Sequence, residues 1–392
     1  MDIKSDFYKY QGQTSKHPLA IEILSASGSY IYSSDGREIL DFIAGVSANS
    51  LGHNHPKVIK AIQKQLSLYS HVMVYGEFIQ KPQLMLCKAL AKTLPNSLSS
   101  VYLVNSGAEA AEGALKLAKR VTGRSEIIAC KNSYHGCTQG AMSVCGNEKR
   151  NRAFRPLIPD VQFIQYNNNC DIKKISRKTA GVILETIQGS AGFIEPKDNF
   201  LAKVKQRCTE VGALLILDEV QTGIGRTGTF WGFENYSTTP DIIIAGKGLG
   251  GGMPIGVFIS STELMNSLRE RPKLGHISTF AGHPIIAAAA LATVNEIKET
   301  NLMTEALRKE QLIRSFFKNH PKVKEIRGRG LMLALIVESA EFASQVILNC
   351  LDRGLLLFWL LYESRAIRIS PPLTISDQEI EKGCNVLLKA LG

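Results

Sequence analysis

Seven short runs of aliphatic residues between about residues 100 and 260 place the strongest constraint on the fold of this chain. They alternate with stretches of helical periodicity, and several are continuous Val, Ile and Leu runs. Such runs are typical of strands buried on both faces of a mainly parallel sheet, and their alternation with helices indicates the α/β class. The predicted strands cover residues 101–104, 127–130, 161–164, 182–185, 214–218, 242–245 and 257–259.

The two ends of the chain predict a smaller α+β part. Apolar residues flank a Ser-Ser-Asp-Gly turn at 33–36, which is typical of a β-hairpin. After Pro284 the chain is mostly helical, with apolar residues on one face of each predicted helix. The predicted domains are 49–294 for the large one and 1–48 together with 295–392 for the small one.

Composition and charge exclude several classes of protein. No stretch of the 392 residues approaches the ~20 consecutive apolar residues of a membrane span. Residues 1–10 mix acids and bases and do not resemble a signal peptide. The net charge is +11, but the only dense basic cluster, 149–155, is better interpreted as a solvated loop or an anion-facing patch than as a nucleic-acid site. We therefore expect neither a nucleic acid nor a membrane as partner.

The eight cysteines indicate a reducing compartment. No pair has C-x-x-C spacing, and no Cys/His cluster resembles a zinc site. Free thiols are usual in the cytoplasm. We therefore expect a cytoplasmic protein with no bound metal.

Three predicted strands deliver polar residues at their carboxyl ends, where open α/β sheets bind ligands. These residues are Glu185, Asp218 and Lys247. Lys247 has small neighbours, so we expect its amine to be poorly solvated, with a lowered pKa, as covalent catalysis by a lysine requires. Considered alone, Lys247 is better interpreted as a surface lysine in a glycine-rich loop, and Asp218 could be a helix cap.

Residues 105–109, Asn-Ser-Gly-Ala-Glu, follow the first predicted strand and open a helix over 109–121. Backbone N–H groups at a helix start, helped by a serine hydroxyl, can bind an anion such as phosphate. An ordinary Ser or Asn cap at the helix start is an equally good interpretation of this segment alone.

In combination, these segments resemble the class III, fold-type-I aminotransferases that use pyridoxal 5′-phosphate (PLP). Within that family, the sequence is similar to the acetylornithine, ornithine and 4-aminobutyrate aminotransferases over nearly its whole length. The motifs occur in family order: Asp41-Phe42 with Leu51-Gly52-His53-Asn54-His55-Pro56, Asn105-Ser106-Gly107-Ala108-Glu109-Ala110, Tyr134-His135-Gly136, residues 217–223, the Lys247 segment, and Ser278-Thr279-Phe280 with His283-Pro284.

The resemblance implies a role for each matching residue. Lys247 would hold the cofactor covalently and move a proton during catalysis, and Asp218 would pair with the protonated pyridine nitrogen so that the ring acts as an electron sink. Arg368 and Glu185 would contact the substrate, with Arg368 binding a carboxylate through both guanidinium nitrogens. The remaining cofactor contacts are Ser106, Gly107 and Ala108 at the phosphate, Tyr134 stacked on the ring, Gln221 at its phenolic oxygen, and Thr279 at the phosphate across a homodimer interface.

The resemblance predicts a transaminase that moves an amino group from an ω-amino or basic amino acid to a 2-oxo acid such as 2-oxoglutarate. The alternative is a PLP-dependent 2,1-aminomutase of the glutamate-semialdehyde type, which would share Lys247 and Asp218 and need no 2-oxo acid. A dinucleotide oxidoreductase would require G-x-G-x-x-G directly after the first strand and an acidic residue about twenty residues further on, and the chain offers no such unit. A non-catalytic basic binding module would not need a lysine, an aspartate and an anion site at neighbouring strand ends.

Three residues depart from the family pattern. Ser190 stands where many relatives have a glutamate that neutralises the carboxylate-binding arginine while the ω-amino donor reacts. Cys137 stands where a basic residue is usual, and His283 replaces the more usual asparagine. These departures bear on the amino donor and leave the predicted cofactor site intact.

Overall fold

The computed structural model describes residues 3–392 and places the seven predicted strands in a single sheet with the order β4-β10-β9-β8-β7-β5-β6. Neighbouring strands from β9 to β6 run parallel, and β10 runs antiparallel to both β4 and β9. The α/β fold with a mainly parallel sheet is therefore confirmed. The strands are β4 (Ser100–Val104), β5 (Glu126–Cys130), β6 (Val161–Ile164), β7 (Thr179–Glu185), β8 (Leu214–Asp218), β9 (Ile242–Gly246) and β10 (Gly256–Ser260).

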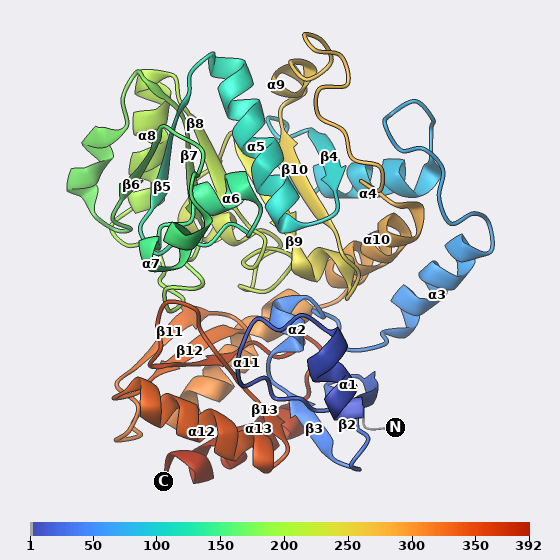
Figure 1. Ribbon diagram of the computed structural model, residues 1–392, viewed down its shortest axis with the longest axis vertical. Helices are drawn as coiled ribbons and strands as arrows, with labels where there is room; N and C mark the ends of the chain where they lie inside the picture. The colour runs from blue at the N-terminus through green and yellow to red at the C-terminus, as the bar shows by residue number, and fades with distance from the viewer. Residues whose placement is uncertain (1–2) are drawn as a thin grey trace.

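Both faces of this sheet are buried, which explains the continuous apolar runs. Successive side chains of a strand point to opposite faces, and Leu215 and Leu217 of β8 share one core cluster with Val204, whereas Ile216 belongs to a second cluster with Ala114. Val204 lies on α8 and Ala114 on α5, which crosses the near side of the sheet in Figure 1. The helices in this part of the chain are α3 (Pro56–Leu66), α4 (Lys81–Ala91), α5 (Gly107–Thr122), α6 (Gln139–Ser143), α7 (Glu148–Asn151), α8 (Phe200–Val211), α9 (Thr262–Asn266) and α10 (Pro284–Glu299).

The two ends of the chain lie together in the lower part of Figure 1. The predicted hairpin is present as β2 and β3, and Leu355 of β13 pairs in parallel with Leu40 of β3, so both ends share one sheet of order β1-β2-β3-β13. A second sheet has the order β11-β12-β15-β14. The strands are β1 (Ile23–Ser27), β2 (Tyr30–Ser33), β3 (Glu38–Asp41), β11 (Glu325–Arg329), β12 (Met332–Ile336), β13 (Leu355–Leu356), β14 (Phe358–Trp359) and β15 (Ala366–Ile369).

Helices α1 (Ile3–Tyr10), α2 (Ala44–Ser47), α11 (Leu302–Phe317), α12 (Ala340–Asp352) and α13 (Asp377–Leu391) accompany these sheets. The short 3-10 helices are η1 (Arg152–Phe154), η2 (Asn169–Lys174), η3 (Gly232–Tyr236) and η4 (Lys247–Gly250). The division into domains at residues 48/49 and 294/295 stays a prediction. Among residues 3–392, no helix is long and apolar enough to cross a membrane.

Two local predictions differ from the structure. The helix expected over 109–121 begins at Gly107, because Ser106 caps it and thereby fixes its start two residues earlier. The basic cluster 149–155 is exposed but is not simply a loop, since it contains most of α7 and the short helix η1. A run of charged residues does not indicate backbone conformation, so the basic cluster did not predict α7 or η1.

Candidate active site

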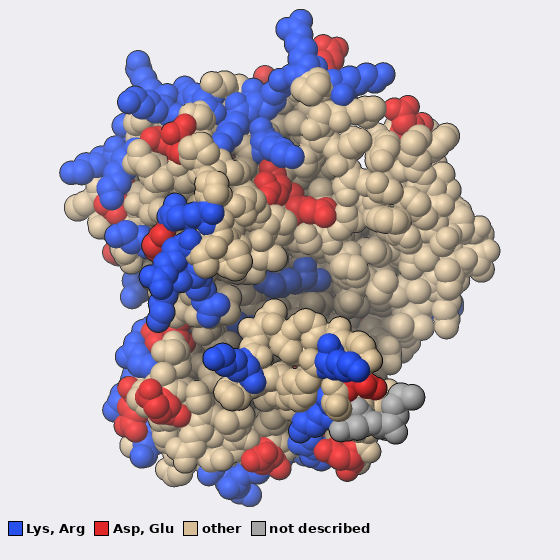
Figure 2. Space-filling model, viewed as in Figure 1, with Lys and Arg blue, Asp and Glu red and all other residues tan. Residues whose placement is uncertain are grey.

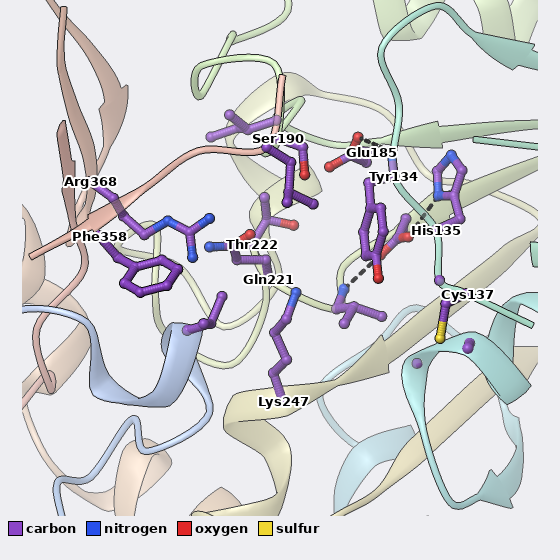
Figure 3. Close-up of a pocket in the computed structure, with 18 of the residues that line it drawn as sticks. Tyr134, His135, Cys137, Glu185, Ser190, Gln221, Thr222, Lys247, Phe358 and Arg368 are labelled. Carbon is purple, nitrogen blue, oxygen red and sulfur yellow. Dashed lines mark hydrogen bonds and ion pairs between the residues drawn. The ribbon is translucent and has the colours of Figure 1, made fainter. Parts of the chain in front are cut away.

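A cavity of about 380 Å³ lies between the large sheet and the C-terminal third of the chain. Figure 3 shows Lys247 and Glu185 pointing into it from the strand ends, with Arg368 approaching from the opposite side. Asp218, which ends β8, also lines the cavity. The structure thus brings together the strand-end groups and the arginine that the sequence singled out.

Lys247 is the first residue after β9 and begins η4. Its backbone has a φ of +42°, a left-handed conformation that is uncommon for a residue with a side chain and is often found at functional sites. Burial lowers the pKa of the Lys247 amine, and the nearby Arg368 lowers it further, whereas Asp218 and Glu185 oppose this shift. The amine is therefore unprotonated at a lower pH than that of an exposed lysine, as a nucleophilic lysine requires.

Asp218 is 6% exposed and has partners for both carboxylate oxygens. His135 Nδ1 lies 2.8 Å from Asp218 Oδ2, and the backbone N–H of Val220 donates to Oδ1 at 2.9 Å. These contacts fix the carboxylate at the cavity wall. His135 was not predicted as a site residue, although it belongs to the Tyr134-His135-Gly136 motif, because a partner 83 positions away leaves no local signal.

The start of α5 presents two backbone N–H groups to the cavity. Ser106 caps the helix, and its hydroxyl accepts a hydrogen bond from the N–H of Glu109 at 3.2 Å. Gly107 and Ala108 are the next two residues, whose N–H groups have no partner within the helix, and both line the cavity. Ser106 does not line it, so its side chain is engaged as a cap while the helix start remains suited to an anion.

Tyr134, Gln221 and Glu185 line the middle of the cavity. Glu185 accepts hydrogen bonds from the backbone N–H groups of Tyr134 (3.0 Å) and Gly189 (2.8 Å), and burial raises its pKa to about 7. The Glu185 carboxylate therefore holds two cavity-lining segments together. Thr279, the remaining predicted phosphate contact, lies outside the cavity on an exposed segment, where its hydroxyl is 3.5 Å from Tyr75 Oη.

The wall opposite Lys247 is mainly apolar. Phe358, Trp359 and Leu361 line it, and Arg368 projects from β15 beside them (Figure 3). Arg368 is 6% exposed, and its Nε has no hydrogen-bond partner among residues 3–392. Burial lowers the Arg368 pKa to about 10. Neither aromatic residue was predicted, because β14 has only two residues and a strand this short shows no periodicity.

Fold and site together define a class of enzyme. The ornithine aminotransferase of Toxoplasma gondii superposes with a TM-score of 0.91 at 31% identity, covering 100% of this chain and 94% of that one. The family model for class III aminotransferases matches residues 10–391. This chain belongs to the class III aminotransferases, with pyridoxal phosphate as its cofactor.

Two relatives show which class III aminotransferases this chain is similar to. The acetylornithine aminotransferase of Methanopyrus kandleri is 37% identical over 394 residues, covering 100% of this chain and 99% of that protein. A transaminase of Sulfolobus acidocaldarius named for [LysW]-aminoadipate semialdehyde and glutamate semialdehyde is 36% identical over 375 residues, covering 95% of both chains. Transamination is therefore the activity of this chain.

The cavity residues fit pyridoxal phosphate. A buried amine of lowered pKa, a fixed carboxylate and a helix start with free N–H groups surround one cavity. These are the groups needed for an aldehyde, a pyridine nitrogen and a phosphate. Residues 3–392 contain no cluster of three or more His, Cys, Asp or Glu residues that could hold a metal ion.

Proposed function

We propose that this enzyme transfers an amino group from an ω-amino or basic amino acid, of the ornithine, acetylornithine or 4-aminobutyrate type, to a 2-oxo acid such as 2-oxoglutarate. The observation that carries the proposal is the buried Arg368, whose Nε lacks a partner in the cavity that holds Lys247. A buried guanidinium gains most from a carboxylate that replaces lost hydration. The names of the relatives from Methanopyrus, Sulfolobus and Toxoplasma support donors of this type.

Each cavity residue then has a role on the protein side. Pyridoxal phosphate supplies the electron sink that makes the substrate carbon acidic. Lys247 would hold the cofactor and then carry a proton on Nζ, which its lowered pKa favours. Asp218 would hold a proton at the pyridine nitrogen, and Gly107 and Ala108 would bind the phosphate through backbone N–H groups.

Tyr134 would pack against the cofactor ring and Gln221 would donate to its phenolic oxygen. Gln221 Nε2 lies 3.4 Å from Ser47 Oγ, a long contact that a better acceptor could replace. Arg368 would bind one substrate carboxylate, and Glu185 would contact the substrate from the neighbouring wall. All of these residues lie in positions consistent with the proposal, since each except Ser47 lines the cavity.

We also propose a cytoplasmic homodimer with active sites at its interface. Thr279 is exposed, its chain neighbour Phe280 is 54% exposed, and Ile79 in another segment is 92% exposed. Much of the right-hand surface in Figure 2 shows neither Lys or Arg nor Asp or Glu. An uncharged surface with exposed large apolar residues is suited to burial against a second copy. The eight free cysteines agree with a reducing compartment.

A half-reaction screen tests the proposed donors. Enzyme loaded with pyridoxal phosphate is mixed with single amines, and the visible absorbance of the bound cofactor is followed without any 2-oxo acid. We expect ornithine, acetylornithine or 4-aminobutyrate to discharge this band fastest. If none of the three discharges it while another class of amine does, the proposed donor class is wrong. Multiple turnovers of glutamate 1-semialdehyde without a 2-oxo acid would instead favour the aminomutase alternative.

A further inference from the structure

Arg150 reaches from the large-sheet side of the molecule to a residue that forms part of the active-site cavity wall. It lies on α7, and its Nη2 donates to the backbone oxygen of Leu361 at 3.3 Å. Its guanidinium carbon lies 5.7 Å from the centre of the Tyr362 ring, within the range of a cation–π contact. Leu361 itself lines the cavity. Arg150 is itself exposed and does not line the cavity, but these two contacts hold its guanidinium against the wall that Leu361 forms.

Tyr362 contacts Arg150 through its ring and a cavity-lining residue through its backbone. Its backbone N–H donates to the backbone oxygen of Ser190 at 3.0 Å, and Ser190 lines the cavity. Burial raises the pKa of Tyr362, and Arg150 opposes this shift. Burial also raises the pKa of Tyr134, and the charge of Arg150 again opposes this rise. Arg150 thus contacts Tyr362, whose backbone in turn is bonded to a residue that lines the cavity.

The positive charge of Arg150 is available to a ligand. Within residues 3–392 it forms no ion pair, whereas Arg155 in the same basic cluster is paired with Glu148. Figure 2 shows Lys and Arg side chains gathered in the region of α7, beside the hollow between the upper and lower parts of the molecule. A guanidinium has five N–H donors and no acceptor, so one bond to a carbonyl leaves several donors for an anion.

We propose that Arg150 binds the distal carboxylate of the substrate, the carboxylate farther from the reacting nitrogen, while Arg368 binds the near one. This inference rests on the proposed function, because it concerns substrates with an acidic group at each end. Arg368 and Lys247 line the same cavity, so a carboxylate bound by Arg368 belongs to the end of the substrate that holds the reacting nitrogen. Arg150 lies just outside the cavity lining, against Leu361 and Tyr362, where a longer substrate that extends past Leu361 would meet its guanidinium.

The competing explanation is that Arg150 only fastens the two walls of the cavity together. A fastening role would affect every substrate equally, because all of them need the same closed cavity. A carboxylate contact would affect only substrates that carry the distal carboxylate. Two acceptors of equal chain length separate these roles: 2-oxoglutarate has a second carboxylate, and 2-oxopentanoate ends in a methyl group.

The test compares R150Q with the unsubstituted holoenzyme on both acceptors. We expect the KM for 2-oxoglutarate to rise about tenfold with kcat nearly unchanged, and the constants for 2-oxopentanoate to stay the same. R150K should recover part of the loss, because lysine keeps the charge but not the planar pair of donors. The matched control is R152Q, which removes an exposed arginine of the same cluster and should leave both acceptors unaffected.

Four results would overturn the proposal. Equal losses on both acceptors would mean that Arg150 only fastens the walls, and no loss on either would mean that it faces solvent. An unsubstituted enzyme that prefers 2-oxopentanoate would also contradict a distal carboxylate site while leaving the proposed donor class standing. If the unsubstituted enzyme uses neither acceptor with any proposed donor, the proposed function fails, and the inference about Arg150 fails with it.

Discussion

The two sides of the active-site cavity differ in how their polar groups are satisfied. On the side of the large sheet, Asp218 is bound by His135 and by a backbone N–H, and Glu185 accepts two backbone hydrogen bonds. On the C-terminal side, Arg368 has an unpartnered Nε among apolar neighbours. Both carboxylates of the first side are thus bound within this chain, whereas the arginine of the second side has a donor left for a ligand. The groups proposed to hold the cofactor thus lie on the sheet side, whereas the arginine proposed to bind the near carboxylate of the substrate lies on the C-terminal side.

This difference has an energetic cause. A buried carboxylate with fixed donors is already stabilised, and losing a partner from such a site costs about 3–5 kcal/mol. The guanidinium of Arg368 instead carries a burial cost, which lowers its pKa to about 10. A substrate carboxylate that binds Arg368 offsets the cost of burying its guanidinium. The same contact also orients the substrate in the cavity.

The largest expected effect comes from Lys247→Ala, which removes the reacting amine from the sheet side. We expect multiple turnover to be abolished, while pyridoxal phosphate still binds without a covalent link. Steady-state assays and dialysis-resistant cofactor content measure the two effects. Lys273→Ala, at an exposed position, is the matched control. Retention of substantial turnover in a folded Lys247→Ala enzyme would contradict the assigned role.

The next largest effect is expected from Asp218→Asn, which breaks the pair with His135 and should lower kcat. A loss of about 3–5 kcal/mol corresponds to a fall in kcat of roughly two to four orders of magnitude. The exposed Asp352→Asn should change nothing, since its carboxylate lies at the end of α12. Near-normal kcat in folded, cofactor-loaded Asp218→Asn enzyme would rule out the proposed contact with the pyridine nitrogen.

Arg368→Ala acts on the C-terminal side and should mainly change substrate binding. Hydrogen bonds to charged groups contribute about 1.5–3 kcal/mol, so the KM for the 2-oxo acid should rise roughly 10- to 100-fold. Arg368→Lys should lie between the alanine variant and the original enzyme, because it keeps the charge without the paired donors. A KM that does not change would show that the carboxylate binds elsewhere.

The smallest effect is expected from Ser190→Glu, which places a carboxylate in the cavity that holds Arg368. A glutamate that pairs with this arginine should weaken α-amino donors by several-fold and spare ω-amino donors. Ser190→Gln is the control, because glutamine is nearly the same size as glutamate but carries no charge. It should leave the ratio of α-amino to ω-amino donor efficiencies unchanged. An unchanged ratio in folded, cofactor-loaded Ser190→Glu enzyme would break the link between this wall and donor choice.

The sequence was most informative about the sheet side. Lys247 and Asp218 could be predicted because each directly follows a strongly apolar run, and such runs fix where a strand ends. Cys137 also lines the cavity, so the departure at that position does face the site. Ser106 caps α5 through its hydroxyl, and its contact with the phosphate stays a prediction.

The C-terminal side was less predictable for a physical reason. Phe358 and Trp359 lie on a strand of two residues, and Arg150 contacts a residue 211 positions away in the chain. Contacts of this kind depend on how distant segments pack and leave no local pattern. Thr279 illustrates a further limit, because its predicted role depends on a second copy of the chain.

The central claim is that Lys247 carries the cofactor, and reductive trapping tests it most directly. The holoenzyme is treated with borohydride, which reduces a lysine–cofactor link to a stable secondary amine, and the labelled peptide is located by mass spectrometry. We predict one labelled site at Lys247 and none in Lys247→Ala. A label on any other lysine of the unsubstituted enzyme, with Lys247 unmodified, would contradict the account.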